Sequence, residues 1–329
     1  MTLIRIISST AAVFLVLGLG GVSCRERSGH QPVRLAIGAQ QSPSQLLIYL
    51  AHELDTFRAC GTAVQIEEFP GSGKALEALV GGSVDVLSGY HEQTMQLPAG
   101  APRLRSFTAM TNGHLTALVV SPAAGSIDRL SGRKIGVTTL GSATHLWLNF
   151  FLTKRGIAPE EVIPVAISTA ARAVAAMERG VVDAGVVSDF TVRTLEKRFG
   201  TVRVLADTRT PETARAFYGV DQYPGTALLA KSDWIAAHPD SARGLACAVG
   251  RARQWAQSHT AREVVARMPL SHHGADEALY TEVIRGTLLM LTPDGRFTAE
   301  GAEAARRLAR SSQSASDSYT NEFAGSPAR

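Results

Sequence analysis

Apolar and polar positions repeat the same pattern in two stretches of the chain. RLAIGAQQSPSQLLIYLA begins at Arg34, and KIGVTTLGSATHLWLNFF begins at Lys134. Each stretch opens with a short apolar run, passes through a turn of small residues, and then spaces its apolar residues along one helical face. Both stretches therefore predict a strand, a turn and a helix, in that order.

A second pair of stretches extends the repeat. ALEALVGGSVDV begins at Ala75 and AVAAMERGVVDA at Ala173, and each predicts a helix, a glycine stop and a strand. Second strands are expected at 64–69 and 162–168, and third strands at 84–89 and 182–188. Because strands that alternate with helices form parallel sheets, the sequence predicts an α/β fold with two similar lobes, each a mainly parallel sheet flanked by helices.

Two more apolar runs, at 114–122 and 225–233, are expected to be the strands that cross between the lobes. The crossings place lobe 1 in residues 33–118 and 231–310, and lobe 2 in residues 119–230. From Asp233 onward the pattern is mainly helical.

Both ends of the chain have a composition of their own. An uncharged run follows Arg5 and ends in small residues, which predicts a secretory signal peptide over residues 1–23. The residues GVSC that end at Cys24 resemble a bacterial lipobox, although Gly21 stands where leucine is usual. We therefore expect a lipid on Cys24, which would anchor the protein to a membrane, and a polar tether over 24–32. A plain cleaved signal and an uncleaved anchor are the alternatives.

The last stretch, 311–329, is polar and low in aliphatic residues. It predicts a loose tail, and the alternative is that Tyr319 and Phe323 dock it.

Composition narrows the function classes. The net charge is +4, and lysine and arginine are scattered rather than interleaved with aromatic residues, so nucleic acid is not an expected partner. Cys60 and Cys247 could pair in an exported protein, or they could be two small buried residues. The chain has no C-x-x-C motif, and the adjacent pairs His91-Glu92 and His272-His273 are not expected to chelate a metal ion.

The stretch EFPGSGKAL (68–76) invites comparison with a phosphate-binding loop. That pattern needs glycine at 68 and a hydroxyl at 75, where this chain has Glu68 and Ala75. Glu68 would repel a polyphosphate, and without the hydroxyl a magnesium ligand is lacking, so we exclude a P-loop. A Gly/Ser turn that begins a helix is expected instead. The stretch SPSQ (42–45) likewise predicts a helix start, with a capping box and proline at the first helical position.

Four stretches resemble the substrate-binding proteins of ABC importers, in the nitrate/sulfonate/taurine and pyrimidine-precursor group. They are EEFPGSGKALEALVGGSVDV, LSGRKIGVTTLGSATHLWLNFFLTKRGIAPEEV, ERGVVDAGVVSD and LLAKSDWIAAHPDSARGLACAVGRARQW. The resemblance implies a periplasmic-binding-protein fold of type II that closes on a small ligand and delivers it to a permease and its ATPase subunits. It also implies an exported, monomeric protein without catalytic activity or cofactor.

The ligand of such a protein would bind beyond the carboxyl ends of the strands, where the helices begin. Helix starts present unpaired N–H groups and a partial positive charge, so they hold an anion without lysine or arginine. The candidate ligand-binding residues at these turns are Gln41, Ser42, Ser72, Gly73, Ser88, Tyr90, His91, Gly141, Ser142, Thr144, Thr169, Asp189 and Tyr223. As alternatives, Ser42 could only cap its helix, and Ser72, Gly73 and Gly141 could serve the turns alone.

Asp189 is the one acidic residue among these candidates, and it directly follows a predicted strand of lobe 2. A carboxylate in an anion site lowers affinity unless it faces a cation, so the ligand is expected to carry an amine, as taurine or an aminopyrimidine does. The sequence leaves two other functions open. A receptor could present the same ligand to a membrane sensor, and a pyrimidine-synthase-like enzyme could share the fold, although that branch carries a cysteine-rich motif that this chain lacks.

Overall fold

The computed structural model describes residues 31–38, 42–168, 170–273 and 276–325. Within these residues the strands form two five-stranded sheets. The signal peptide, Cys24 and all but the last two residues of the tether lie outside the described residues, as do the site candidates Gln41 and Thr169.

The two sheets have the same order of strands. The first sheet has the order β2-β1-β3-β10-β4 and the second has the order β7-β6-β8-β5-β9. The strands of the first sheet are β1 (Val33–Ile37), β2 (Val64–Glu68), β3 (Val86–Tyr90), β4 (Leu104–Ala109) and β10 (Thr226–Lys231). Those of the second are β5 (Thr116–Val120), β6 (Lys134–Val137), β7 (Ile163–Ala166), β8 (Ala184–Ser188) and β9 (Val204–Asp207). The predicted α/β fold with two similar halves is therefore confirmed.

The sheets are mixed rather than parallel throughout. In the first sheet β1 pairs in parallel with β2 and β3, whereas β10 pairs antiparallel with β3 and β4. The second sheet repeats this arrangement with β5 in the place of β10. The parallel prediction thus holds for the three strands that alternate with helices, and it missed the edge strands β4 and β9.

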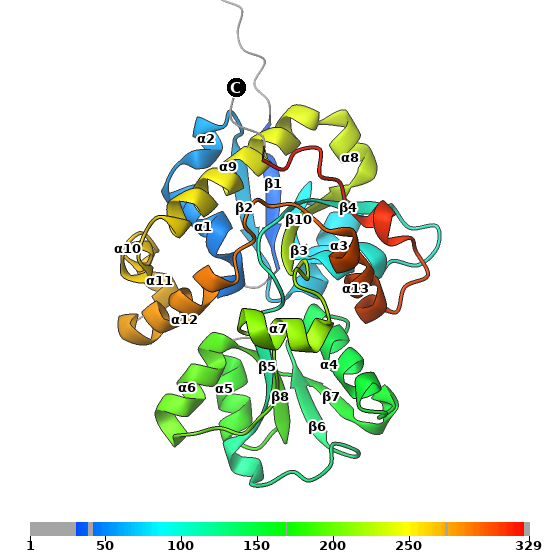
Figure 1. The fold of residues 1–329 in the computed structure, drawn as a ribbon, viewed down its shortest axis with the longest axis vertical. Coiled ribbons are helices and arrows are strands. Elements are labelled where there is room, and N and C mark those ends of the chain that lie inside the picture. The colour runs from blue at the N-terminus through cyan, green and yellow to red at the C-terminus, as the bar shows by residue number, and fades with distance from the viewer. Residues whose placement is uncertain (1–30, 39–41, 169, 274–275, 326–329) are drawn as a thin grey trace, which may run out of the picture. The chain divides into compact units, whose positions relative to one another are not determined.

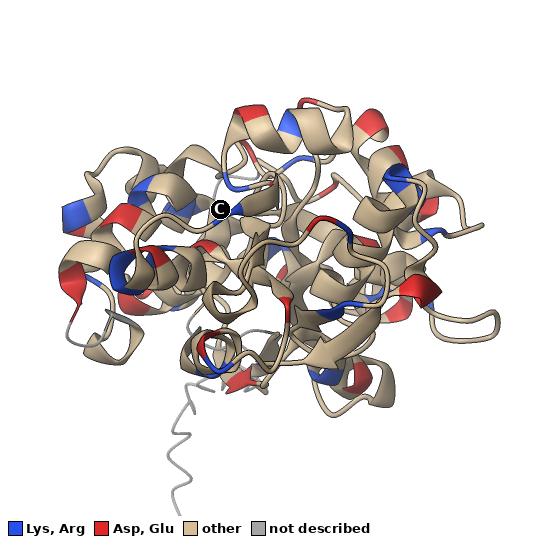
Figure 2. Cartoon of the chain, turned by 90° about the horizontal axis from the view of Figure 1, so that it is seen from below, with Lys and Arg blue, Asp and Glu red and all other residues tan. Residues whose placement is uncertain are grey.

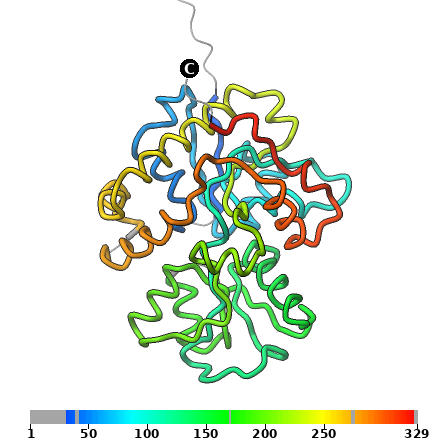
Figure 3. Tube along the Cα trace, viewed as in Figure 1, coloured from blue at the N-terminus to red at the C-terminus, as the bar shows by residue number. Residues whose placement is uncertain are grey.

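The chain crosses between the sheets twice, as predicted. β5 follows β4 along the chain but belongs to the second sheet, and β10 follows β9 but belongs to the first. Figure 3 shows both passages along the trace. Each sheet therefore receives its fourth strand from a crossing of the chain.

Helices cover both faces of each sheet (Figure 1). Those of the first half are α1 (Leu46–Glu53), α2 (Thr56–Ala59), α3 (Ser72–Gly81), α8 (Ser232–Ala237), α9 (Pro239–Gln257), α10 (Ala261–Val265), α11 (Leu270–His273), α12 (Glu277–Leu289) and α13 (Ala299–Ala309). Those of the second half are α4 (Ala143–Lys154), α5 (Ala170–Glu178), α6 (Asp189–Phe199) and α7 (Pro211–Tyr218). α12 also contacts α6, and α13 contacts α4, so the two halves touch through these helices.

Alternation along the strands divides the core into layers. Leu35 and Ile37 of β1 belong to one buried cluster with α1 and α9, while Ala36 between them belongs to another with α3. The second sheet divides its side chains in the same way, with Leu118 on the α4 side and Ala117 on the opposite side. Successive side chains of a strand point to opposite faces, so each strand contributes to two layers.

Equivalent aspartates show the repeat at atomic level. The Asp85 carboxylate accepts a hydrogen bond of 2.9 Å from the Arg34 backbone N–H, and the Asp183 carboxylate accepts one of 2.8 Å from Lys134. In both halves the aspartate therefore ties the beginning of the third strand to the beginning of the first. These two residues were matched in the sequence repeat, and they keep the same contact.

Two predictions of local structure were wrong. Ser42 is the N-cap of a short 3-10 helix, η1 (Pro43–Gln45), and Pro43 takes the first position, but no capping box forms. The Ser42 hydroxyl contacts Ser44 at 3.0 Å, and the buried Gln45 side chain contacts Ser88 instead. A loose C-terminal tail is also wrong, because Phe323 is 1% exposed and packs edge-on against Phe107.

Charged residues of both signs are interspersed over the elements seen in Figure 2. None of the helices in the described part of the chain has the length and apolar character needed to cross a bilayer.

A disulfide joins Cys60, which ends α2, to Cys247 in α9. Their Cα atoms are 6.0 Å apart, and the bridge spans 187 residues of sequence. The disulfide rules out the alternative of two unpaired, buried cysteines. The bridged stretch of chain contains the whole second sheet, so the bridge restricts the unfolded chain over a long loop.

Replacing both Cys60 and Cys247 by serine is expected to lower the free energy of unfolding by about 3–5 kcal/mol, because a long loop loses its closure in the unfolded state. Urea unfolding of the wild type and the double variant measures the difference. Wild-type protein incubated with a reductant should approach the variant. Equal unfolding midpoints for oxidised wild type and variant would contradict the expectation.

His91 is fully buried and holds the C-terminal segment. Its ring nitrogens contact the hydroxyls of Ser106 at 2.9 Å and Ser318 at 3.2 Å. Burial lowers the pKa of His91 to about 3. The imidazole of His91 is therefore neutral in the native state, because burial disfavours its protonated form.

Because the folded pKa of His91 lies below the usual value, its contribution to stability is complete above pH 6.5 and is lost as the pH falls toward 3. Between pH 7 and pH 4.5 this single group is expected to remove about 2–3 kcal/mol of unfolding free energy. Urea unfolding at both pH values tests it. His91→Gln should lose that part of the pH dependence, whereas His238→Gln, at an exposed position, should keep it.

Candidate functional site

A cavity of about 90 Å³ lies where the carboxyl ends of the parallel strands of both sheets meet. Its walls come from both halves of the protein. The lining residues of the first half and of the first crossing are Gly38, Ser42, Pro43, Ser44, Ser72, Tyr90, His114, Leu115 and His272. Those of the second half are Thr116, Thr138, Ala143, Thr144, Ser168, Ala173, Val186, Val187, Ser188, Asp189, Phe190 and Thr191.

Several helices begin at this cavity. Ser72 is the first residue of α3, Ala143 is the first residue of α4, and Asp189 is the first residue of α6. The first N–H groups of a helix have no partner inside the helix, and they carry a partial positive charge. Three such starts around one cavity favour a negatively charged or strongly polar occupant.

The approach of β1 to α3 requires a glycine. A Cβ atom on Gly38 would lie 2.8 Å from the Cα of Ser72, closer than such atoms approach in proteins. The end of the first strand can therefore reach the beginning of α3 only because residue 38 has no side chain.

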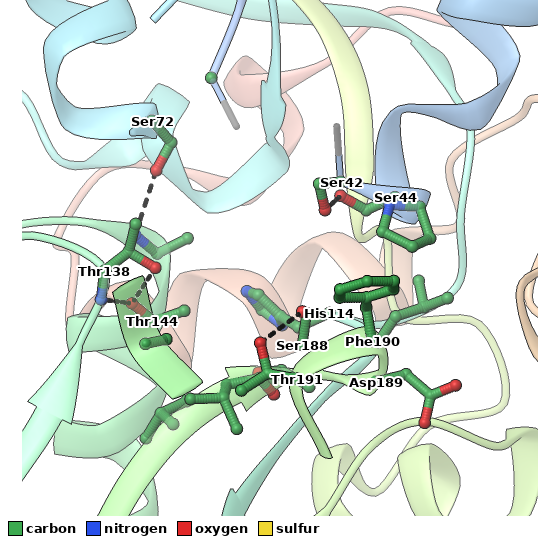
Figure 4. Close-up of a pocket in the computed structure, with 18 of the residues that line it drawn as sticks. Ser42, Ser44, Ser72, His114, Thr138, Thr144, Ser188, Asp189, Phe190 and Thr191 are labelled. Atoms are coloured by element: carbon green, nitrogen blue, oxygen red, sulfur yellow. Dashed lines mark hydrogen bonds between the residues drawn. The ribbon is translucent and has the colours of Figure 1, made fainter. Parts of the chain in front are cut away.

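Hydroxyl groups form most of the polar wall (Figure 4). After β6 the Thr144 hydroxyl contacts Ser142 at 2.9 Å and donates to Thr138 at 3.1 Å. It also accepts from the Thr138 backbone N–H at 2.9 Å. After β8 the hydroxyls of Ser188 and Thr191 lie 3.4 Å apart. These bonds orient the turns while leaving lone pairs and rotatable hydrogens for a ligand.

The two halves meet directly at one side of the cavity. The Ala143 backbone N–H, at the start of α4, donates to the Ser72 hydroxyl at the start of α3 over 3.5 Å. Figure 4 draws this bond between the two halves. The start of one helix thus provides a hydrogen-bond partner for an N–H group at the start of the other, and Ser72 and Ala143 both line the cavity.

Aromatic rings form another part of the wall. The rings of Tyr90 and His114 stack with centroids 4.6 Å apart, and the Tyr90 hydroxyl donates to the His114 carbonyl at 3.3 Å. Desolvation raises the pKa of Tyr90 to about 12, so its hydroxyl stays neutral. Phe190 projects toward the group of Ser42 and Ser44 in Figure 4. The cavity therefore has apolar surface next to its hydroxyl groups.

Two residues at the cavity have a strained backbone. Leu115 has φ 48° and Ser168 has φ 62°, in the left-handed region that residues other than glycine rarely adopt. Both residues line the cavity. The Leu115 carbonyl accepts a hydrogen bond of 3.3 Å from the Asp189 N–H, so the strained turn also fixes the start of α6. Strain of this kind is typical of functional sites.

Asp189 lines the cavity, but two arginines neutralise its carboxylate. Arg193 lies 2.8 Å from one oxygen and Arg209 lies 2.7 Å from the other, and the Asp189 side chain is 8% exposed. In Figure 4 this side chain extends away from Ser188 and His114. The reason for predicting an amine on the ligand therefore no longer holds, because Arg193 and Arg209 already balance the charge of Asp189.

Five of the predicted ligand-binding residues line the cavity. They are Ser42, Ser72, Tyr90, Thr144 and Asp189. Gly73, Ser88, His91, Gly141, Ser142 and Tyr223 do not line it.

Ser88, His91 and Tyr223 are all at most 2% exposed, and each bonds inside the protein. Ser88 contacts Gln45, and the Tyr223 hydroxyl donates to the Glu92 carboxylate at 3.3 Å. Ser142 is the N-cap of α4 and reaches the cavity only through Thr144.

Other lining residues were not among the predicted ones. Ser44, Thr138 and Thr191 stand within three positions of a predicted residue, so the strand-end argument could have included them. His114, Leu115 and Thr116 come from the first crossing, and His272 comes from α11. No local pattern marks these positions, because only the packing of the two halves brings them to the cavity.

In the described stretches of the chain, no group of three or more histidine, cysteine or acidic side chains could hold a metal ion.

Two α/β halves of equal topology, with helix starts converging on a shared cavity, define the protein as one with the periplasmic-binding-protein fold. The chain belongs to the NMT1-like family, whose model matches residues 28–271. This assignment confirms the resemblance to the substrate-binding proteins of the nitrate and sulfonate group. No curated protein matches the chain.

Solved structures agree with this fold. A protein of Bordetella bronchiseptica RB50 is 32% identical, with a TM-score of 0.83, and the match covers 89% of this chain and 96% of that one. The alkanesulfonate-binding protein SsuA from Xanthomonas axonopodis pv. citri, bound to MOPS, is 19% identical, with a TM-score of 0.70 and coverage of 88% and 98%. The periplasmic nitrate-binding protein NrtA from Synechocystis PCC 6803 is 16% identical, with a TM-score of 0.59 and coverage of 77% and 68%.

Replacing Asp189 by asparagine is expected to lower the free energy of unfolding by about 1–3 kcal/mol, because the half-buried Arg209 loses one of its two carboxylate partners. The affinities for taurine and for ethanesulfonate, which lacks the amine, should change by the same factor. Thermal unfolding and calorimetric titration measure the two effects.

Asp55→Asn is the matched control, since Asp55 forms an exposed pair with Arg58 and the loss of such a pair should leave the unfolding temperature nearly unchanged. A selective loss of taurine affinity in Asp189→Asn would restore the prediction of an amine-binding carboxylate.

Proposed function

We propose that the protein is the extracytoplasmic solute-binding component of an ABC importer, and that it captures a small organic anion in the cavity between its two halves. One observation carries the proposal: the beginnings of α3, α4 and α6 converge on a cavity that both sheets share. A cavity built in this way releases its ligand when the halves separate, which is what delivery to a permease requires.

The charge of the proposed ligand follows from the wall of the cavity. Neither lysine nor arginine is among its lining residues, and its one acidic lining residue, Asp189, is paired. Helix starts and hydroxyl groups then supply the positive potential and the hydrogen bonds for an anion. The relatives whose names mention an alkanesulfonate or nitrate support an anion of this class.

The shape of the ligand follows from the other part of the wall. Leu115, Val186, Val187 and Phe190 give the cavity an apolar side next to its hydroxyl groups. An anion with a short carbon chain or a ring would use both sides, since apolar burial adds to binding. We therefore place organic sulfonates ahead of nitrate as the proposed ligand class.

The proposed role also covers the parts of the protein that act outside the cavity. We assign residues 33–118 and 231–310 to one lobe and residues 119–230 to the other, with boundaries that fall within the crossing strands β5 and β10. The signal peptide would export the chain to the periplasm or the cell surface, and a lipid on Cys24 would hold it at the membrane beside the permease and ATPase subunits. The disulfide between Cys60 and Cys247 fits an exported protein, because such bonds persist in oxidising compartments.

A panel of small ligands tests the proposal on the chain from residue 25 onward. Methanesulfonate, butanesulfonate, taurine, nitrate, bicarbonate and an aminopyrimidine are each added in a thermal-shift experiment. A ligand present at about 100 times its Kd should stabilise the folded protein by about 2.7 kcal/mol. Butanesulfonate is expected to give the largest shift, because it combines an anion with an apolar chain.

Gly38→Val provides a matched negative control, since its side chain would collide with the start of α3 and narrow the cavity. The variant should lose the shift that butanesulfonate gives. The proposal fails if the whole panel leaves the wild-type unfolding temperature unchanged.

A further inference from the structure

Phe190 connects the cavity to the apolar core of the opposite half. It is the second residue of α6, in the second half, and it lines the cavity. The same side chain is partly buried against the main apolar cluster of the first half. That cluster includes Tyr280 and Ile284 of α12, the first-half helix that contacts α6. One wall of the cavity is therefore a ring from the second half that packs against the core of the first.

Contacts at both ends of α6 hold this ring at the boundary between the halves. A Cβ atom on Gly286, late in α12, would lie 3.8 Å from the Oδ2 atom of Asp189 at the start of α6. Near the end of α6 the Lys197 Nζ atom lies 2.6 Å from a carboxylate oxygen of Asp276, which precedes α12. The two helices thus run side by side in opposite directions, and Phe190 follows the contact at Gly286.

Phe190 and two of the three helix starts lie on different sides of the cavity. Figure 4 draws Ser72, Thr138 and Thr144 together on one side, at the starts of α3 and α4. It draws Phe190 near Ser44 on the other side. An anionic group held at the starts of α3 and α4 would therefore direct its carbon chain toward Phe190.

Polar contacts fix the other aromatic wall, which His114 provides. The Nε2 atom of His114 lies 2.7 Å from the carboxylate of Glu92, in a short 3-10 helix, η2 (His91–Met95), and its Nδ1 atom contacts the Tyr218 hydroxyl. The side chains of His114 and Glu92 are both 0% exposed. The Phe190 ring has no polar atom, so packing alone determines where it lies. Of these two rings, Phe190 is the one that a long ligand can displace.

We propose that Phe190 determines the longest carbon chain that the cavity accepts. This inference rests on the proposed function of the same cavity as the site of an organic anion. Each methylene buried in the cavity strengthens binding until the chain reaches the ring. A longer chain has to push the ring away from the first-half cluster, which exposes apolar surface and forces α6 away from α12.

Calorimetric titrations with the straight-chain sulfonates from methanesulfonate to octanesulfonate test the inference. For the wild type, the Kd should fall by about fourfold with each added methylene as long as the chain stays short of Phe190. Beyond that length the Kd should rise by at least about tenfold, because the added atoms overfill a packed site. The chain length of tightest binding is the turning point of the series.

Variants of two phenylalanines in α6 assign the turning point. Phe190→Ala removes the ring, so its Kd should keep falling through octanesulfonate. Phe190→Leu shortens the side chain and should move the turning point to a longer sulfonate. Phe199→Ala is the matched control, since Phe199 ends the same helix, is 50% exposed and is not among the lining residues. It should keep the wild-type turning point.

A wild-type Kd that shows no rise up to octanesulfonate overturns the inference and leaves the proposed function intact. The same holds if Phe190→Ala changes every Kd by one common factor, because the ring then stabilises the closed protein without limiting chain length. A turning point that moves in Phe199→Ala also counts against it. If Phe190→Ala does not fold, Phe190→Leu decides, and an unchanged turning point refutes the inference. If no sulfonate binds to the wild type, the proposed function and this inference fail together.

Discussion

The structure depends on one constraint, that the peptide N–H groups at the beginning of a helix must find a partner outside that helix. In both halves the helices follow parallel strands, so their beginnings gather at the carboxyl edges of the sheets. The crossing strands β5 and β10 turn these two edges toward each other. Where the halves touch, Ala143 donates to Ser72, so one helix start becomes the partner of another. The remaining starts face the cavity, which gives that cavity its positive potential.

The second feature of the site is the set of partners that its two carboxylates find within the chain. Two carboxylates stand near the cavity, Asp189 in its wall and Glu92 in contact with the lining residue His114. Each receives its partner from within the chain. Asp189 is held by Arg193 and Arg209. Glu92 contacts His114 and accepts a hydrogen bond from the Tyr223 hydroxyl. The carboxylate in the wall therefore has two arginines as partners, whereas the one beside the wall has a histidine and a phenol.

The sequence was sufficient for the features that depend on local pattern and repetition. The strands β1, β3, β6 and β8 and the helix starts behind them follow from apolar runs and small-residue turns, and the repeat predicted that both halves share one topology. The edge strands β4 and β9, which occupy equivalent places in the two sheets, were missed, because the matched stretches of sequence do not extend to them. The polar composition of the tail favoured a loose segment, and docking by Tyr319 and Phe323 was only the alternative; in the structure Ser318 bonds to His91, and Phe323 is 1% exposed. Lining residues at the strand ends could be predicted from the sequence, whereas the lining residues of the first crossing, His114, Leu115 and Thr116, could not.

The partial failure of the site prediction has a cause in the repeat itself. His91 and Asp189 occupy equivalent positions, one residue after β3 and one after β8. In the second half an α-helix begins there, and its first residues face the cavity. In the first half the chain turns into η2 and buries His91 together with Glu92. The argument from strand ends therefore placed His91 in the cavity wall, where the protein instead has His114 from the crossing. The departure from the repeat is what brings a buried acid and a histidine together beside the cavity, and an exact duplication would have provided a second helix start in their place.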